Sequence, residues 1–354
     1  MTRLLVTCNC SNLKNFSLSC NVGKDTNLVN EWLCGFIKPK IEELSLQFKE
    51  IREPLVFPAQ LFTCATLTEF FLDMRHVFKL PSYIHFQCLQ TLTLFNIIFP
   101  DTSSTQQLFC GCPALEDLSL LDCNWKNVQA VCIYSPLLRR IYIREDEDDI
   151  LGEDDDYDNV TNCCEVLIIG NNLKSFTYNG NCMNKYFLHG STLVIDASIQ
   201  VLSRTTSLLG QLPLFCNLAE LSFDFISSIE LSYAALLAIL RNSPCLQVLN
   251  FQGGLSLAKD NANCIFDPLP VCFSTTLRTI EINCITWKKD ELFAIKILLK
   301  AATVLDNLRI WGCCIQSKKL YKQILKYRNS SNSFQIQVPL STPLEHIFKE
   351  GESL

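Results

Sequence analysis

A short pattern of hydrophobic positions recurs eleven times along the chain, written L-x-x-L-x-L with Ile, Phe or Tyr allowed at the anchor positions. Its last part alternates apolar and polar residues, which is typical of a short strand with one buried face. One unit cannot bury its own apolar edge, so we expect neighbouring units to stack as a parallel ladder. The copies begin at Leu13, Ile41, Leu67, Leu89, Leu115, Leu138, Leu173, Leu218, Leu246, Leu277 and Leu305.

The spacing of these copies identifies the kind of repeat. Most successive copies start 22 to 31 residues apart, near the roughly 20–29 residues of a leucine-rich repeat. Two intervals are longer: one of 35 residues contains an acidic run, and one of 45 residues is expected to hide a degenerate repeat with its strand at Leu193-Val194-Ile195. We therefore predict an α/β fold, a leucine-rich-repeat solenoid with a curved parallel sheet and helices or irregular crossovers on its convex side.

The segments between the copies support the same architecture. Residues 28–37, 233–241 and 291–301 have amphipathic patterns that predict crossover helices. Chance could produce one such pattern in a leucine-rich chain, but eleven copies separated by crossover lengths argue against chance. A Rossmann-type fold is disfavoured because the 12 glycines form neither G-x-G-x-x-G nor a P-loop.

The chain has 20 cysteines, which raises the question of its redox compartment. Its length and the polar N-terminal stretch MTRLLVTCNCSNLKNF argue against a small secreted disulfide scaffold with a signal peptide. Cys88, Cys245 and Cys284 lie in or beside apolar stretches, where we expect buried, reduced thiols that act as small hydrophobes. We predict a cytoplasmic or nuclear protein, and the absence of an 18-residue apolar run predicts no membrane span.

Two cysteines fit the repeat itself. Cys123 and Cys313 occupy the last position of an extended form, L-x-x-L-x-L-x-x-C. There we expect the side chain to bond backbone groups where the chain turns away from the strand.

The net charge of −6 is unevenly distributed. Residues 145–158 hold ten acidic and no basic residues, so the 30 basic residues face 26 acidic ones elsewhere and the remainder carries +4. No Lys/Arg cluster suggests a phosphate track, so nucleic acid is not an expected partner. We interpret the run as a solvated acidic insertion between repeats that could attract a basic partner.

The acidic run matches the calcium-binding loop of an EF-hand only in part. The possible calcium ligands at loop positions 1, 3, 5, 9 and 12 are Asp154, Asp156, Asp158, Asn162 and Glu165. Position 6 is Asn159 instead of Gly, and residues 166–169 predict a strand instead of an exiting helix. We therefore expect no calcium site here.

Catalytic and metal-binding patterns are equally weak. The chain contains no C-x-x-C, and its C-x-C pairs lack histidines at zinc-finger spacing. The four histidines, His76, His85, His189 and His346, lie in no G-x-S-x-G or H-E-x-x-H sequence. We predict no enzyme activity, no cofactor and no metal.

Turns before several strands carry a more specific signature. The segment GCPALEDLSL, at residues 111–120, resembles that of plant F-box/LRR proteins, including the FBD class. Residues 29–33, 41–46 and 55–64 resemble the early repeats of these proteins, and residues 291–338 are similar to their C-terminal FBD segment. On this basis we expect a repeat domain at 1–265 with the acidic insertion at 145–158, the last repeats and an FBD-like segment at 266–340, and a tail at 341–354.

The resemblance implies a protein-interaction scaffold, the substrate-recognition part of an SCF-type E3 ubiquitin ligase adaptor. An F-box opens with a helix of the form LP-x-E-I/L, which this sequence does not show, so we expect the F-box to be absent. The expected partner is an unknown substrate protein, with a Skp-type adaptor and a cullin only if an F-box is supplied elsewhere. The alternative is a small-ligand or hormone receptor with an enclosed apolar pocket in the concave face.

Strand positions that point away from the core are the candidate binding residues, because solenoids bind through their concave face. Exposed aromatic residues and arginines are the usual hot spots of interfaces. The predicted protein-binding residues are Phe71, Phe95, Arg140, Tyr142, Arg309 and Trp311. The alternative at each position is that a crossover loop covers the side chain.

Overall fold

The computed structural model describes residues 13–23, 26–36, 40–145, 164–180, 184–189, 196–201, 215, 217–223, 231–252, 254–255, 257–258, 268–285, 289–312 and 335–337. The chain divides into two compact units, Met1–Ala219 and Glu220–Leu354. The expected domain boundaries at 265 and 340 stay predictions. In the described residues, no helix is both long enough and apolar enough to cross a bilayer.

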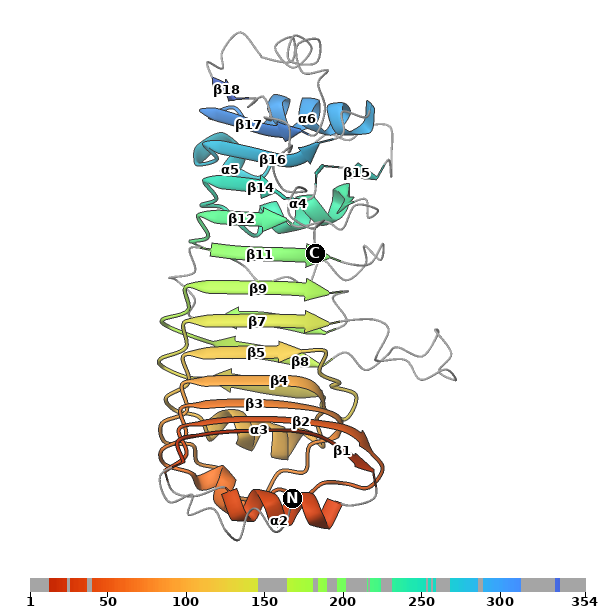
Figure 1. Ribbon diagram of the computed structural model, residues 1–354. Helices are drawn as coiled ribbons and strands as arrows, with labels where there is room; N and C mark the ends of the chain where they lie inside the picture. Colours follow the sequence, from red (N-terminus) through yellow and green to blue (C-terminus); the bar gives the residue numbers. More distant parts are fainter. Residues whose placement is uncertain are drawn as a thin grey trace, which may run out of the picture. The chain divides into compact units, whose positions relative to one another are not determined.

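The main sheet of the first unit is a parallel ladder with one strand from each repeat (Figure 1). Its order is β1-β2-β3-β4-β5-β7-β9-β11, and each strand pairs in parallel with the next. The strands are β1 (Asn15–Gly23), β2 (Glu43–Ile51), β3 (Glu69–Val77), β4 (Thr91–Ile98), β5 (Asp117–Leu121), β7 (Arg140–Glu145), β9 (Ser175–Gly180) and β11 (Asp196–Val201). The predicted leucine-rich-repeat fold is confirmed.

The anchor positions form the core because the strands stack in register. Leu72, Leu94 and Leu120 are consecutive partners on β3, β4 and β5, and all three are buried. The first anchor of each repeat, such as Leu89, is buried beneath the turn that enters the strand. Leu13, in the first repeat, is only half-buried.

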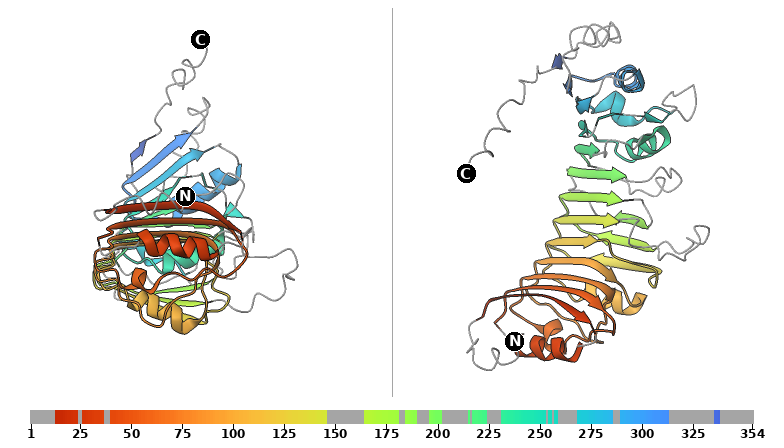
Figure 2. Two further views of the ribbon diagram at one scale, coloured as in Figure 1. Left: turned by 60° about the horizontal axis from the view of Figure 1, so that its bottom comes forward. Right: turned by 45° about the vertical axis from the view of Figure 1, so that its right-hand side comes forward.

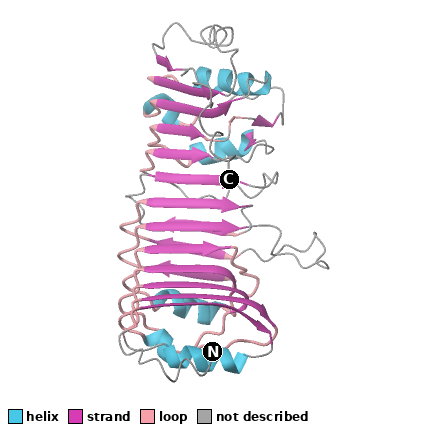
Figure 3. Ribbon diagram, in the orientation of Figure 1, coloured by secondary structure: helices cyan, strands magenta, loops and turns pink. Residues whose placement is uncertain are grey.

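Helices and a second sheet lie behind the main sheet of this unit (Figures 2 and 3). The helical segments are α2 (Thr26–Phe36), the 3-10 helix η1 (Ala59–Thr63) and α3 (Thr102–Cys110). The second sheet has the order β10-β8-β6, from β6 (Ala130–Tyr134), β8 (Glu165–Ile169) and β10 (Lys185–His189). Helix α2 confirms the helix predicted at 28–37, and β8 confirms the strand predicted at 166–169. The second sheet was not predicted as a layer.

Side-chain hydrogen bonds join these crossovers to one another. Asp101 caps the N-terminus of α3, since its carboxylate accepts hydrogen bonds from the amide and hydroxyl of Ser104, both at 2.8 Å. These bonds lower the pKa of Asp101. Gln106 of α3 donates to the carbonyl of Cys132 at 2.8 Å and accepts from its amide at 2.7 Å, which ties the helix to β6.

In the second unit the ladder strands are again parallel and follow the order β12-β14-β16-β17-β18. Its strands are β12 (Glu220–Phe223), β14 (Val248–Phe251), β16 (Thr279–Ile285), β17 (Asn307–Gly312) and β18 (Gln335–Gln337), with a separate pair β13 (Leu231–Ser232) and β15 (Leu257–Ala258). Its helices are α4 (Tyr233–Arg241), α5 (Val271–Thr275) and α6 (Lys289–Ala301). Helices α4 and α6 confirm the helices predicted at 233–241 and 291–301.

The strand of the hidden repeat lies slightly later than expected. The expected strand, Leu193-Val194-Ile195, falls outside the described residues, and the observed strand is β11. Ala197 and Ile199 are the register partners of the anchors Phe176 and Tyr178. The prediction missed this strand because a small alanine occupies an anchor position that the pattern reserves for a large side chain.

Candidate functional site

We call one face of the first unit's main sheet the open face. This face points away from the helices and from the second sheet. Because side chains alternate along each strand and the strands are in register, its residues form three rows. The first row is Asn15, Glu43, Glu69, Thr91, Asp117, Arg140, Ser175 and Asp196. The second row is Ser17, Ser45, Phe71, Thr93, Ser119, Tyr142, Thr177 and Ser198. The third row is Ser19, Gln47, Asp73, Phe95, Leu121, Arg144 and Asn179.

The second row explains why two aromatic residues stand out on this face. All its other members are serines or threonines, whose side chains are short. Phe71 and Tyr142 are therefore two large side chains in a row of otherwise short ones, and both are half-buried. Aromatic residues in such polar surroundings are typical hot spots of protein interfaces.

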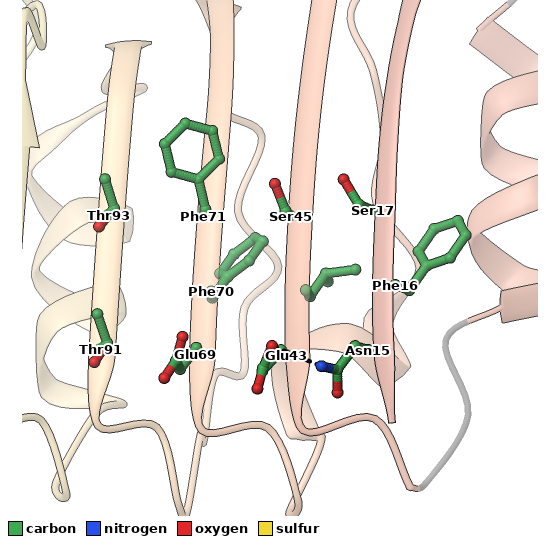
Figure 4. Close-up of a pocket in the computed structure, with 11 residues that line it drawn as sticks. Asn15, Phe16, Ser17, Glu43, Ser45, Glu69, Phe70, Phe71, Thr91 and Thr93 are labelled. Atoms are coloured by element: carbon green, nitrogen blue, oxygen red, sulfur yellow. Dashed lines mark hydrogen bonds between the residues drawn. The ribbon is translucent and has the colours of Figure 1, made fainter. Parts of the chain in front are cut away.

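A hollow of about 410 Å³ lies on the open face across β1 to β4 (Figure 4). Its polar and aromatic lining on this face is Asn15, Ser17, Glu43, Ser45, Glu69, Phe71, Thr91 and Thr93, and we call this set the acidic groove. Phe16, Leu44 and Phe70 line it from below. Figure 4 shows Glu43 and Glu69 on neighbouring strands, with the ring of Phe71 on the same face of β3 as Glu69.

The two carboxylates of the acidic groove lack a cation among the described residues. Glu43 and Glu69 are direct register partners on β2 and β3, and both are exposed. Glu43 accepts a hydrogen bond from Nδ2 of Asn15 at 2.8 Å. Glu69 has no hydrogen bond or ion pair with any residue that the structure describes. Like charges directly opposite one another are mutually unfavourable, so the groove attracts positive charge.

The arrangement on β5 and β7 is different. Arg140 donates to Asp117 at 2.6 Å, and this bond raises the pKa of the Arg140 guanidinium. Arg144 binds both carboxylate oxygens of Asp122, with its Nε 3.1 Å from each oxygen. The Arg144 guanidinium also lies 5.1 Å from the centre of the Phe95 ring. Both arginines of this region are therefore paired within the chain.

Asp122 can hold its arginine partly because of its backbone. It lies directly after β5 with φ of 52°, and its side chain is only 4% exposed. Asn96 occupies the equivalent place in the preceding repeat, with φ of 56°. Asparagine and aspartate tolerate this left-handed region better than other non-glycine residues.

The structure distributes the six predicted binding residues between the two units. Phe71, Phe95, Arg140 and Tyr142 all point out of the open face of the first unit, but only Phe71 lines the acidic groove. Arg140 and Phe95 contact Asp117 and Arg144, respectively. Their role in binding stays a prediction.

The other two predicted residues lie on β17 in the second unit. Arg309 is the register partner of Glu281 on β16, and its Nη1 lies 2.5 Å from the Glu281 carboxylate. Trp311 is 46% exposed. Arg309 is thus paired like Arg140, whereas Trp311 offers an open aromatic surface.

Glu43 and Glu69 were missed by the sequence-based prediction. Each directly precedes the second anchor of its repeat, the same place that Asp117 and Arg140 occupy in later repeats. Aligning the repeats by their anchors would have shown glutamates at this position in two consecutive repeats. The prediction favoured aromatic and arginine residues and therefore passed over carboxylates.

Glu145 corrects the interpretation of the acidic run. It was counted with the solvated insertion, but it ends β7 and is buried. Its carboxylate accepts hydrogen bonds from Tyr178 at 2.6 Å, Asn184 at 2.7 Å and Tyr186 at 2.5 Å. Burial, followed by the negative charge of Glu145, raises the pKa of Tyr186 well above its usual value.

This buried cluster joins the two sheets, because Tyr178 belongs to β9 and Tyr186 to β10. Gly180 allows the close approach of β9 to β7, since a Cβ there would lie 2.7 Å from the carbonyl oxygen of Glu145. Glu145 therefore has a structural role, whereas the rest of the acidic run, residues 146–158, lies outside the described residues.

Most of the possible calcium loop lies outside the described residues. Asp154, Asp156, Asp158 and Asn162 lie outside the described residues. Glu165 begins β8 and pairs with Lys185 at 3.3 Å. Among the described residues, no group of three histidines, cysteines, aspartates or glutamates is placed to hold a metal ion.

The described cysteines range from buried to exposed. Cys88 and Cys245 are exposed, contrary to the prediction, because they lie in the turns that precede their strands. Cys123 is buried as expected, and its thiol contacts the carbonyls of Leu94 at 3.5 Å and Leu121 at 3.6 Å. The side chain of Cys284 and all of Cys313 lie outside what the structure describes. Burial raises the pKa of Cys123 to about 12, so this thiol stays protonated at neutral pH.

The parallel ladder and its open polar face define a leucine-rich-repeat protein. The sequence profile of the family described as "FBD-associated F-box protein At5g56370, LRR repeats" matches residues 29–169. Residues 29–169 are thus similar to the leucine-rich repeats of an FBD-associated F-box protein, and the chain resembles F-box/FBD/LRR-repeat proteins of Arabidopsis thaliana.

Three relatives from Arabidopsis thaliana illustrate the similarity. F-box/FBD/LRR-repeat protein At5g56420 is 30% identical over 41% of this chain and 34% of its own length. F-box/LRR-repeat protein At3g26922 is 28% identical over 41% of this chain and 48% of its own length. FBD-associated F-box protein At4g13985 is 25% identical over 92% of this chain and 79% of its own length. The chain therefore spans a third to a half of the length of the first two.

Proposed function

We propose that this chain is a protein-interaction scaffold, the substrate-recognition part of an SCF-type E3 ubiquitin ligase adaptor. The observation that carries the proposal is the second row of the open face, in which Phe71 and Tyr142 rise among serines and threonines. The surrounding short hydroxyl side chains leave room for a partner backbone to approach both rings. The names of the relatives support an F-box context, in which the bound partner is a substrate protein.

The proposed role needs no catalytic group and no cofactor. Contact with a Skp-type adaptor and a cullin would run through an F-box, and the substrate would bind the repeats, in the cytoplasm or the nucleus. The three described histidines lie on β3, before β4 and at the end of β10, and none of them lines the acidic groove.

A small-ligand or hormone receptor has less support. That function predicts an enclosed apolar cavity, whereas the hollow on β1 to β4 lies on the open face and carries two carboxylates. Its shape and charge suit a side chain of a polypeptide better than a buried apolar ligand.

A pull-down from plant extract tests the proposed function. We expect Tyr142→Ala combined with Trp311→Ala to lose most captured partners. The matched control is Tyr134→Ala combined with Phe187→Ala, which removes rings 51% and 43% exposed on the second sheet. If the control loses the same partners and the first variant keeps them, the partners bind neither at Tyr142 on the open face nor at Trp311 on β17.

The proposed link to the ligase is tested by a separate co-purification experiment. A chain with an F-box fused upstream should co-purify with a Skp-type adaptor and a captured substrate together. Capture of the adaptor without any protein that depends on Tyr142 would contradict a role in substrate recognition.

A further inference from the structure

We propose that the acidic groove binds a lysine or arginine side chain of the partner polypeptide, so that the recognised segment pairs a basic residue with a neighbouring apolar one. This inference rests on the proposed function and adds the chemistry of the partner to it. Its basis is the pair Glu43 and Glu69, two exposed carboxylates in register with no cation among the described residues.

The geometry of the groove suits one long basic side chain. Adjacent strands lie about 4.8 Å apart, so a single cation placed between β2 and β3 reaches both Glu43 and Glu69. Phe71 lies two residues after Glu69 on β3 and on the same face. At about 3.3 Å per residue, the backbone positions of these two residues are about 6.6 Å apart. The aliphatic stem of a lysine or arginine can pack on Phe71 while its charged end meets the carboxylates.

The hydroxyl groups of the acidic groove complete this arrangement. Ser45 and Thr93 flank Phe71 in the second row, Ser17 lies beyond Ser45, and all three are short enough to leave the Phe71 ring accessible. Thr91 lies beside Glu69 in the first row and adds a hydroxyl without charge. A segment laid across these strands meets polar groups that can bond its backbone, one aromatic surface and one site of negative charge.

The contrast with β5 and β7 favours a basic partner over an acidic one. There each arginine of the open face is already held by a carboxylate, Arg140 by Asp117 and Arg144 by Asp122. An acidic segment would have to break these pairs to gain a cation. A basic segment needs no such rearrangement, because Glu43 forms no ion pair with a described residue and keeps only its bond with Asn15.

Selection of displayed random peptides on the full chain tests the proposal. We expect the enriched peptides to carry lysine or arginine beside an apolar residue. The combined variant Glu43→Gln and Glu69→Gln should bind synthetic copies of them at least about tenfold more weakly, since two charge-assisted contacts are lost. The matched control Glu31→Gln and Glu53→Gln removes two exposed carboxylates outside the groove and should bind like the unaltered chain.

Stability separates loss of binding from loss of structure. The Glu43→Gln and Glu69→Gln chain should unfold at the same or a higher temperature, because it loses a repulsion and the amide oxygen introduced by Glu43→Gln can still accept the bond from Asn15. Raising the salt concentration should weaken binding to the unaltered chain and have little effect on the variant.

Several results would overturn the proposal. Enrichment of peptides without lysine or arginine would do so, as would binding of the enriched peptides to the groove variant as tightly as to the unaltered chain. Binding of spermidine at Glu43 and Glu69 without any peptide binding there would assign the groove to a small cation instead. Peptides that ignore the groove but depend on Tyr142 would overturn only this inference, whereas peptides that depend on no open-face residue would overturn the proposed function as well.

Discussion

The charged side chains of the open face are paired differently on β1–β3 and on β5–β7. On β5–β7, Asp117 and Asp122 each hold an arginine of the neighbouring strand, at 2.6 and 2.5 Å. On β2 and β3, Glu43 and Glu69 lie side by side and have no cation within the described residues. Paired charges fix the positions of the strands' side chains, whereas unpaired charges of one sign remain available to a partner.

A third acid, Glu145, shows what full burial does on the same strand as Arg140. It bonds two tyrosine hydroxyls and one amide behind the sheet and is 1% exposed. The same residue type therefore serves structure at one end of β7 and, on β2 and β3, is exposed on the surface that we assign to binding.

The largest expected effect comes from removing this buried acid. Glu145→Ala leaves the Tyr178 and Tyr186 hydroxyls and the Asn184 amide without their acceptor. We expect the free energy of unfolding to fall by about 3 kcal/mol or more, because each orphaned buried group costs about 1–3 kcal/mol. Urea unfolding of the full chain measures it.

Two controls accompany this variant. Glu145→Gln keeps one acceptor oxygen and should lose less stability, and Glu165→Ala removes a half-exposed acid on β8 with an effect within about 0.5 kcal/mol. Equal stability of Glu145→Ala and Glu165→Ala would show that the buried cluster contributes nothing.

The next effect tests the paired region. Asp122→Ala removes the partner of Arg144 and places alanine at a φ of 52°. We expect a loss of about 2 kcal/mol, from the charge-assisted bonds and the left-handed backbone together. Asp122→Asn keeps a residue that tolerates this backbone and should lose less; a loss as large as that of alanine would assign the whole effect to the ion pair.

A smaller effect comes from making the unpaired region resemble the paired one. Thr91 lies in register between Glu69 and Asp117, so Thr91→Lys supplies the missing cation. We expect a gain of about 0.2–1 kcal/mol in unfolding free energy and weaker binding of basic peptides. Thr177→Lys, which has Tyr142 and Ser198 as neighbours, should give neither change. Unchanged peptide binding by Thr91→Lys would contradict the account of the groove.

The smallest expected stability change belongs to the groove variant itself. Glu43→Gln with Glu69→Gln should alter the unfolding free energy by no more than about 0.5 kcal/mol, in the stabilising direction, because both residues are exposed. Thermal unfolding followed by circular dichroism measures it. A clear destabilisation would mean that the two carboxylates serve the fold.

Much of the fold follows from local pattern. The anchors of each repeat set strand, register and core at once, so Leu92 and Leu94 could be assigned without a structure. The second sheet could not, because its short strands lie inside crossovers and pair only after the repeats stack. Ala197 hid one strand for a related reason, since its anchor position is defined by its neighbours and not by its size.

The candidate site was predicted only in part. Strand alternation placed Phe71 and Tyr142 on the outer face correctly. The same alternation places Glu145 two residues after the inward Ile143, so its burial could have been inferred, but the acidic residues that follow concealed it. The pairing of Arg140 and Arg144 depends on contacts between strands, which one repeat alone does not contain.

Site-specific photo-crosslinking reports directly whether the open face binds the partner. A photoreactive phenylalanine analogue would replace Phe71 or Tyr142 on the open face, and Tyr134 or Phe187 on the second sheet as controls. We expect the same partner segments to crosslink at Phe71 and Tyr142 and not at the controls, and the segments near Phe71 to contain lysine or arginine. Crosslinks confined to Tyr134 and Phe187 would show that the partner does not bind the open face.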